Sequence, residues 1–332
     1  MSTDQPPSHP LQRIAVVVNP TKFDDLEAVR DGIAKACAEA GWAEPLWLET
    51  TEADPGVGQA REAVDAGVDV VCPLGGDGTV RSVATSLVGT DTPLGLLPGG
   101  TGNLLARNLE LPIERIADAL TVVLTGHDRR IDVGLVRMLP HSESADAVKG
   151  DDSADDPRRE GEEVFLVMTG IGMDAEVMAK TNEKVKGVLG WPAYVLSGVG
   201  RLWSRGFRIQ FSAQGGDPRA RPPRARHARS VLVGNCGSLQ GNFRIMPDAQ
   251  HDDGLLDAVI MSPKGVFGWA GVAADLTSHH RRGHRRIIRL TGTSLEVLTE
   301  HAVGAQIDGD PMGEQYGLTT RILPGALLVR VR

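Results

Sequence analysis

Short apolar runs alternate with segments of helical spacing along the first third of the chain. Residues 13–18 (RIAVVV) form a β-branched run that ends at Asn19 and Pro20, as is typical of a buried parallel strand. Residues 24–40 place apolar side chains at helical spacing, and Gly41 follows as a stop signal. The same alternation predicts strands over residues 45–50, 68–74 and 93–97, and helices over residues 59–66 and 79–87. We therefore expect an α/β domain with a parallel sheet covered by helices on both faces.

Strand-like segments dominate the remainder of the chain. The pattern changes around residues 129–136, and the strand-like segments then cover residues 164–169, 208–213, 230–235, 255–261, 287–291, 294–298 and 326–331. This pattern favours a mainly antiparallel, β-rich second domain. We predict a first domain over residues 11–134, a second over residues 135–313, and a C-terminal segment, residues 314–332, that returns to the first. The polar residues 141–163 are expected to form a mobile surface insertion.

Composition and charge narrow the class of protein. The 332 residues are 41% hydrophobic and 23% charged, which suits a globular protein long enough for two cores. A formal net charge of −8 argues against a nucleic-acid partner. The three cysteines form no CxxC pair, which fits a reducing cytoplasm. Since no apolar run reaches the roughly 20 residues of a membrane span, any membrane contact is expected to be peripheral.

The sequence Gly75-Gly76-Asp77-Gly78-Thr79 lies directly between a predicted strand and a predicted helix. Its glycines would let backbone amides approach an anion at a helix N-terminus, whose dipole favours phosphate. A tight strand-to-helix turn explains the glycines about equally well. Asp77 favours the anion-binding interpretation, because an acid beside a phosphate makes sense when a divalent cation lies between them.

A second glycine-rich turn, Pro98 to Asn103, follows the next predicted strand and contains Gly100, Thr101 and Gly102. Both turns are therefore expected at the same carboxyl edge of the sheet, where open α/β sheets bind ligands. Neither is a Walker P-loop, since GKS and GKT are absent, and neither is a good GxGxxG fingerprint. We expect a nucleotide site that is built from two glycine turns and lacks the P-loop lysine.

Several ordered motifs extend over nearly the whole chain. They are VVNPT at residues 17–21, GGDGT at 75–79, GLLPGGTGNLLARNL at 95–109, RIDVGLV at 130–136, GIGMDAEV at 170–177, DGLLD at 253–257 and IDGD at 307–310. This set resembles the diacylglycerol kinase catalytic-domain family, particularly its soluble bacterial lipid kinases. The resemblance implies an NAD kinase/diacylglycerol kinase-like fold and an ATP-dependent lipid kinase. Diacylglycerol is the expected substrate, and phosphatidic acid the expected product.

The resemblance also implies the residues that hold ATP. They are Asn19, Pro20, Thr21, Thr50, Gly76, Asp77, Gly78, Thr79 and Thr101. The expected nucleotide site also includes the remaining residues of the two glycine turns, Gly75, Gly100, Gly102 and Asn103. Asp77 is further expected to help position the metal and the phosphates. A carboxylate of the IDGD motif is expected to accept the proton of the lipid hydroxyl, with Asp310 as the best match and Asp308 beside it.

A structural magnesium ion is implied near the DGLLD motif. Asp253 would contribute a carboxylate, and Gln250 and Leu255 would contribute backbone oxygens, a ligand set that suits this hard cation. Without the resemblance, a turn that enters a strand is the preferred interpretation of this segment.

Two other functions stay open, one because it shares the GGDGT motif and the other because the chain departs from the family pattern. Val80, Arg81 and Ser82 stand where the family commonly has an apolar residue, Asn and Glu, and Asp310 stands where it has Glu. One alternative is an NAD kinase-like phosphotransferase, which shares GGDGT but acts on a soluble nucleotide. The other is a non-catalytic lipid or nucleotide sensor that has kept the fold.

The expected partner is a lipid substrate at a membrane surface, so we expect a cytoplasmic, peripherally membrane-associated protein. Residues 188–203 are apolar with aromatic side chains, as in a lipid-facing helix or in a core helix of the second domain. Residues 279–286 (HHRRGHRR) are locally basic and suit anionic headgroups, although a solvated loop explains them nearly as well. A homodimer is left open.

Overall fold

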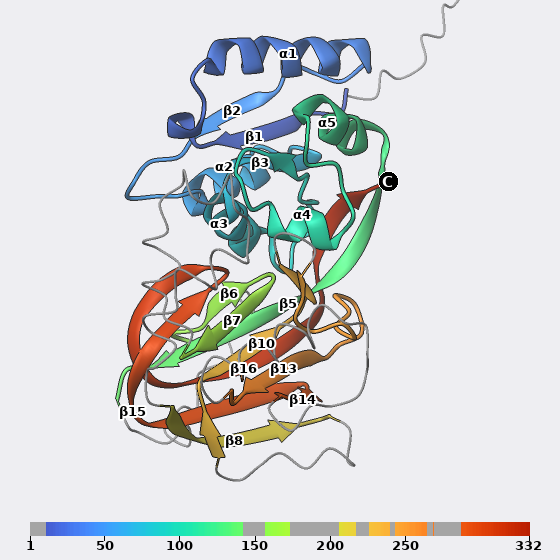
Figure 1. The fold of residues 1–332 in the computed structure, drawn as a ribbon. Helices are drawn as coiled ribbons and strands as arrows, with labels where there is room; N and C mark the ends of the chain where they lie inside the picture. The colour runs from blue at the N-terminus through green and yellow to red at the C-terminus, as the bar shows by residue number, and fades with distance from the viewer. Residues whose placement is uncertain are drawn as a thin grey trace, which may run out of the picture. The chain divides into compact units, whose positions relative to one another are not determined.

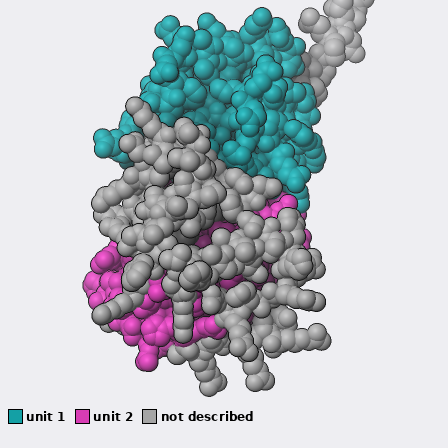
Figure 2. Space-filling model, viewed as in Figure 1, with its two compact units in different colours: residues 1–129, 327–332 teal, residues 130–326 magenta. Residues whose placement is uncertain are grey.

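The chain folds into two compact units. The computed structural model describes residues 11–141, 157–172, 206–216, 226–239, 243–263, 268 and 287–332. Unit 1 comprises residues 1–129 and 327–332, and unit 2 comprises residues 130–326 (Figure 2). The division therefore falls at residue 129, where the sequence suggested residue 134, and the segment that returns to unit 1 begins at residue 327, where the sequence suggested 314.

Unit 1 is built on a parallel sheet with the strand order β2-β1-β3-β4 (Figure 1). Its strands are β1 (Ile14–Val18), β2 (Leu46–Glu49), β3 (Val70–Gly75) and β4 (Leu97–Pro98). All residues of β1 and β3 are buried, as expected for central strands with helices on both faces. The apolar runs of the sequence therefore become the middle of the sheet.

The helices of unit 1 are α1 (Leu26–Glu39), α2 (Val57–Asp65), α3 (Asp77–Leu87), α4 (Leu104–Asn108) and α5 (Ile116–Thr125). Helices α1 and α5 lie together on one face of the sheet, and α2 and α3 pack together on the other (Figure 1). Helix α1 begins after Asp25, whose carboxylate accepts the backbone N–H of Ala28 at 3.0 Å. A local cap and an apolar stripe thus explain where this helix starts and which face it buries.

The C-terminal end of the chain adds to the edge of the unit 1 sheet. Leu94 pairs in parallel with Val329, and its N–H donates to Leu328 O at 2.8 Å. The N–H of Arg330 returns a bond to Leu94 O at 2.9 Å. The side chain of Arg330 also pairs with Asp128 at 2.8 Å, which holds this last segment beside α5.

In the part of the chain that the structure describes, unit 2 contains a ten-stranded sheet with the order β14-β13-β10-β7-β15-β16-β5-β6, to which β8 and β9 attach through β15 (Figure 1). The strands are β5 (His127–Leu139), β6 (Glu163–Phe165), β7 (Met168–Ile171), β8 (Phe207–Gln214), β9 (Arg226–Ala228), β10 (Ser230–Gly234), β13 (Leu256–Met261), β14 (Ile287–Gly292), β15 (Ser294–Ile307) and β16 (Asp310–Val331). A short hairpin joins β11 (Ser238–Leu239) to β12 (Phe243–Arg244). Every strand pair with a described register in unit 2 is antiparallel, which confirms the predicted fold class.

One predicted strand differs from the structure. Residues 164–169 read as a single strand, but the chain forms β6 and β7 with a break at residues 166–167. The backbone N–H groups of Leu166 and Val167 turn toward the carboxylate of Asp308. This bonding partner lies far away in sequence, so the apolar run by itself gives no sign of the break.

The end of the predicted insertion is fixed to the sheet. Arg321 on β16 donates to both carboxylate oxygens of Glu162, at 2.8 and 2.6 Å, and to Pro157 O at 2.7 Å. Burial acts to raise the pKa of Glu162, but the guanidinium groups of Arg321 and Arg159 outweigh it and lower the pKa. Residues 142–156 of the insertion, the apolar stretch 188–203 and the basic cluster 279–286 lie outside the described residues.

Candidate functional site

The residues expected to hold the nucleotide all lie in unit 1, at or near the carboxyl ends of its strands. They are Asn19, Pro20, Thr21, Thr50, Gly75, Gly76, Asp77, Gly78, Thr79, Gly100, Thr101, Gly102 and Asn103. Because the four strands are parallel, their carboxyl ends meet at one edge. The N–H of Asn19 donates to Leu74 O at 3.1 Å, and that of Thr50 donates to Val18 O at 2.9 Å. These two bonds tie together the ends of β1, β2 and β3.

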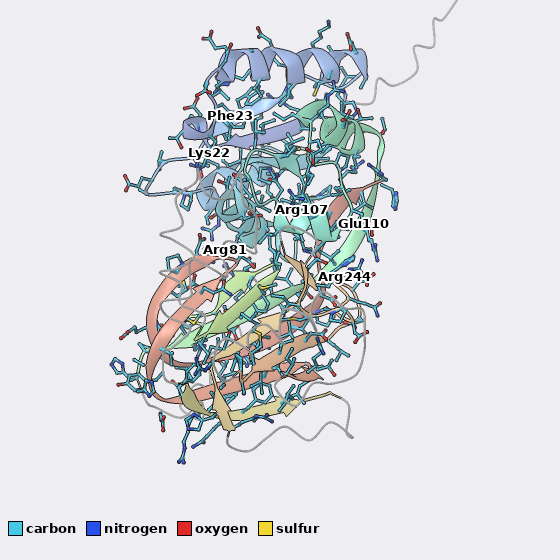
Figure 3. The ribbon with its side chains drawn as sticks, in the orientation of Figure 1. Lys22, Phe23, Arg81, Arg107, Glu110 and Arg244 are labelled. Atoms are coloured by element: carbon cyan, nitrogen blue, oxygen red, sulfur yellow. The ribbon has the colours of Figure 1, made fainter. Side chains whose placement is uncertain are left out.

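The turn after β1 is shaped by Asn19. Its side-chain oxygen accepts the backbone N–H of Thr21 at 3.1 Å and the Thr21 hydroxyl at 2.8 Å, and so caps the short 3₁₀ helix Pro20–Lys22. Proline at the first position of this helix costs no hydrogen bond. Thr21 and Lys22 are exposed, with Lys22 and Phe23 labelled in Figure 3. The structure thus assigns Asn19 a local shaping role and leaves Thr21 and Lys22 on the surface.

The two glycine-rich turns touch each other through their backbones. A Cβ on Gly99 would lie 2.6 Å from the backbone N of Gly75, and one on Gly100 would lie 2.8 Å from the Cα of Gly76. Real Cβ atoms do not approach other atoms this closely, so both positions require glycine for packing alone. Contact between the turns therefore explains part of the glycine content that the sequence attributed to anion binding.

Gly76 differs from these glycines. A Cβ at this position would meet nothing within 4 Å, and the backbone φ of −85° suits any residue. Neither packing nor conformation in the described protein therefore requires glycine here. The open space leaves room for a ligand to approach the backbone, and Gly76 directly precedes the N-terminus of α3, where partial positive charge favours an anion.

Asp77 links the two turns. It is the first residue of α3, and its carboxylate accepts the N–H of Leu104, the first residue of α4, at 2.7 Å. The second carboxylate oxygen of Asp77, Oδ2, lies against Gly102, because a Cβ on Gly102 would collide with it. The acid that the sequence assigned to a metal thus also has a structural contact across the site.

Two further side chains fix the second turn. Asn103 adopts a left-handed conformation, with φ of 47°, and its amide donates to Gly100 O at 2.8 Å. Arg107 on α4, labelled in Figure 3, donates through Nε to Gly102 O at 2.7 Å. Thr101 lies exposed between these anchored carbonyls. Arg107 belongs to GLLPGGTGNLLARNL, one of the motifs that resemble the family. The contact of Arg107 with the turn could not be inferred from the sequence.

Arg81 and Ser82, the two residues of α3 that differ from the family pattern, have different surroundings. The Ser82 hydroxyl donates to Gly78 O at 2.9 Å within the helix, so it is used locally. Arg81 is half-buried on the same helix and is labelled in Figure 3. Its guanidinium places a cationic side chain one turn from Asp77, where the family commonly has a neutral amide.

In unit 2, the IDGD motif forms a tight hairpin between β15 and β16. Ile307 pairs with Asp310, which leaves Asp308 and Gly309 as the two turn residues, both with positive φ. Asp308 is buried, and its carboxylate accepts three backbone N–H groups, whereas Asp310 is half-buried at the start of β16. The two candidate bases therefore have different environments, and the proton-accepting role of Asp310 stays a prediction.

Asp132 is an organising residue that the sequence did not single out. It is buried, and its two carboxylate oxygens accept the N–H groups of Gly254 and Gly325, each at 2.7 Å. Its own N–H donates to His251 O at 2.7 Å, and the Asn235 amide donates to its carbonyl at 2.8 Å. The position of Asp132 in the RIDVGLV segment was the only signal that pointed to it.

Two protein-family models match this chain, one in its N-terminal part and one in its C-terminal part. Residues 13–136 match the diacylglycerol kinase catalytic domain, and residues 166–331 match the YegS C-terminal NAD kinase beta sandwich-like domain. The "Probable lipid kinase YegS-like" protein of Pseudomonas aeruginosa (strain UCBPP-PA14) is 32% identical over 315 residues, which cover 92% of this chain and 90% of that one. A protein with the same description from Pseudomonas fluorescens (strain Pf-5) is 30% identical over 313 residues, which cover 92% of this chain and 91% of that one. The chain belongs to the YegS-like lipid kinases of the diacylglycerol kinase family.

A solved structure of a diacylglycerol kinase from Bacillus anthracis str. Sterne supports the fold of this kinase. It gives a TM-score of 0.67 at 19% sequence identity and covers 97% of each chain. Another structure from the same organism gives a TM-score of 0.73 at 22% identity over 100% of this chain and 98% of the other. Membership in a kinase family implies the use of ATP. None of the helices in the described ranges has the length and apolar character that a membrane crossing requires.

The loop predicted to bind magnesium in this kinase carries concentrated negative charge. Partial burial, together with the carboxylates of Asp132 and Asp252, raises the pKa of Asp253. Burial and the carboxylates of Asp253 and Asp248 raise the pKa of Asp257 to about 7. A bound divalent cation would offset this repulsion, so the charge and the oxygen donors of the loop fit a hard cation such as magnesium.

The three residues predicted to bind magnesium show fewer features of a metal site than the loop as a whole. Asp253 is exposed, and one of its carboxylate oxygens accepts the N–H of Leu255 at 3.0 Å, while Gln250 is an exposed loop residue. Among the described residues, no three His, Cys, Asp or Glu side chains gather closely enough to hold a metal. The predicted set contains only one such side chain, and the magnesium site stays a prediction.

Proposed function

We propose that this protein transfers the γ-phosphate of ATP to the hydroxyl of diacylglycerol, giving phosphatidic acid and ADP. The observation that carries the proposal is the open Cβ position at Gly76, in the first of two touching glycine turns at the carboxyl edge of the unit 1 sheet. Membership in the lipid-kinase family supports the reaction class. An unobstructed backbone at a helix N-terminus suits the phosphates of ATP.

The reaction is an in-line phosphoryl transfer. The lipid oxygen forms a bond to the γ-phosphorus, the bond between that phosphorus and the bridging β–γ oxygen breaks, and ADP leaves with the electron pair. The carboxylate of Asp310 accepts the hydroxyl proton, and the backbone around Gly76 stabilises the phosphate charge. A magnesium ion, when bound with ATP, supplies further charge stabilisation, and Asp77 is the residue that would support it.

The direct test is incubation with γ-labelled ATP, magnesium and separate dispersions of diacylglycerol, monoacylglycerol, a sphingoid base and a polyprenol, with NAD in a parallel reaction. Labelled phosphatidic acid is the expected product. Label on NAD alone would instead identify a soluble-nucleotide kinase. Binding of ATP without transfer to any lipid would identify a sensor.

Gly76→Ala is expected to weaken ATP binding by about tenfold or more, because the added methyl group would occupy the space through which the phosphates approach the backbone. The melting temperature should stay close to that of the wild type, since the methyl group meets no protein atom within 4 Å. Gly32→Ala on α1 is the matched control, with equally open surroundings away from the strand ends. Titration calorimetry provides the measurement, and an unchanged ATP affinity in Gly76→Ala would place the phosphates elsewhere.

Magnesium is expected to raise the melting temperature of the wild type and to have little effect on Asp253→Ala. A ligand at 100 times its dissociation constant stabilises the folded state by about 2.7 kcal/mol, which is easily measured. Asp252→Ala is the matched control, because Asp252 is a neighbouring exposed carboxylate outside the predicted ligand set. Equal magnesium responses in all three proteins would remove Asp253 from the proposed site.

A further inference from the structure

The turn at residues 308–309 combines a demanding backbone with a buried charge. Asp308 and Gly309 have φ values of 48° and 93°, as in the type I′ turns that connect two-residue hairpins. Asp tolerates this left-handed conformation far better than most residues, so the turn alone would accept Asp or Asn at position 308. The N–H of Gly309 donates to the buried side chain of Gln306 at 2.7 Å, which fixes the turn from the other side.

The carboxylate of Asp308 connects this turn to the break between β6 and β7. One oxygen accepts the N–H groups of Val167 and Met168, both at 2.9 Å, and the other accepts that of Leu166 at 2.8 Å. All four residues are buried, with Asp308 only 7% exposed. Without this carboxylate, three buried backbone donors would lose a partner, which destabilises the folded state.

The same arrangement makes Asp308 a poor acceptor for a substrate proton. Protonation would weaken the three bonds that the carboxylate accepts from backbone N–H groups, because a neutral carboxyl group is a weaker acceptor than a carboxylate. Burial and, after it, the neighbouring carboxylate of Asp308 raise the pKa of the Cys236 thiol. Cys236 itself donates toward Leu166 O at 3.5 Å and through its N–H to Val167 O at 3.2 Å. The carboxylate therefore lies inside a packed, hydrogen-bonded corner.

We infer that Asp308 is a positioning residue, whose carboxylate clamps the 166–168 backbone to the 307–310 hairpin and thereby fixes the orientation of Asp310. This role rests on the proposed function of Asp310 as the base, and it removes Asp308 from the list of groups that touch the substrate. Asp310 is the first residue after the clamped turn and pairs directly with Ile307. A shift of the turn therefore moves Asp310 as well.

Asp308→Asn is the variant that disturbs the hydrogen bonds of the clamp and keeps the backbone conformation of the turn. Asparagine is favoured in type I′ turns before glycine, so the hairpin backbone is retained. Its side chain keeps one acceptor oxygen but directs an NH₂ group at a backbone N–H, which breaks part of the clamp. We expect kcat to fall by about 10- to 100-fold, the cost of roughly 1 Å misplacement of a reacting group, with KM for ATP unchanged within about twofold.

A double-mutant cycle with Asp310→Ala distinguishes positioning from a general structural role. If Asp308 acts through Asp310, adding Asp308→Asn to Asp310→Ala should lower the residual rate by less than about twofold. Fully additive losses would overturn the inference, as would a normal kcat in Asp308→Asn. All rates are compared at a temperature where circular dichroism shows each variant to be folded.

Amide hydrogen exchange tests the clamp without any assay of activity. In Asp308→Asn, exchange at Leu166, Val167 and Met168 should accelerate by at least about tenfold relative to the wild type, while β1 stays unchanged. Unchanged exchange at these three amides would overturn the clamp. If the wild type phosphorylates no lipid, the proposed function fails, and the exchange experiment still decides whether Asp308 holds the 166–168 backbone.

Discussion

Asp310→Ala is expected to lower the maximal rate of lipid phosphorylation by about 10² to 10⁴, the usual contribution of a general base. Asp310 is half-buried at the start of β16, directly after the turn that Asp308 anchors. Because the base acts in the transition state and ATP is expected to bind at the strand ends of unit 1, the loss should appear in kcat, with KM for ATP little changed. Steady-state kinetics with dispersed diacylglycerol provide the measurement.

Asp310→Glu is the matched control for this prediction. It restores the side chain that the family has at this position, so it should retain the activity of the wild type or exceed it. A purely steric role would instead predict damage from the added methylene group. Wild-type turnover in Asp310→Ala would exclude Asp310 as the base.

Asp77→Asn is expected to leave the fold intact and to lower phosphoryl transfer by about 10² or more. The amide oxygen of asparagine can still accept the N–H of Leu104, so the link between the two glycine turns is retained. A neutral amide cannot support a divalent cation beside the phosphates as a carboxylate does. Turnover at saturating ATP and magnesium, measured together with the melting temperature, separates the two roles.

Asp77→Ala completes the comparison, because it removes both the charge and the hydrogen bond to Leu104. It should lose activity as Asp77→Asn does and also lose about 1 kcal/mol of stability, a typical net contribution of one hydrogen bond. Full activity in Asp77→Asn combined with a destabilised Asp77→Ala would assign this residue to the structural link alone.

The periodicity of apolar residues was sufficient to predict the strands β1 to β3 and the helices α1 to α3 of unit 1, whereas α4 and α5 were not predicted. The run at residues 13–18 became β1, and the helical spacing over 24–40 became α1, because a parallel strand buries both of its faces and a surface helix buries one stripe. Each of these patterns is local and needs no knowledge of the partner element. The same reasoning predicted the antiparallel character of the second domain.

The glycine motifs were visible in the sequence, but their physical reasons were not. Gly99 and Gly100 are required by contact with the facing turn, while a Cβ added to Gly76 would meet no atom within 4 Å. Both kinds of glycine look alike in a one-dimensional pattern. Only the three-dimensional contacts identify Gly76 as the position that a ligand could approach.

The sequence by itself determined the fold class, the strand ends that form the candidate nucleotide site, and the two acids between which the base was sought. The tertiary structure decided what those acids contact. Asp308 reaches backbone N–H groups about 140 positions earlier in the chain, and Asp132 joins loops at Gly254 and Gly325. Local periodicity reports which face of an element is buried, but it carries no information about which distant backbone group a buried carboxylate will meet.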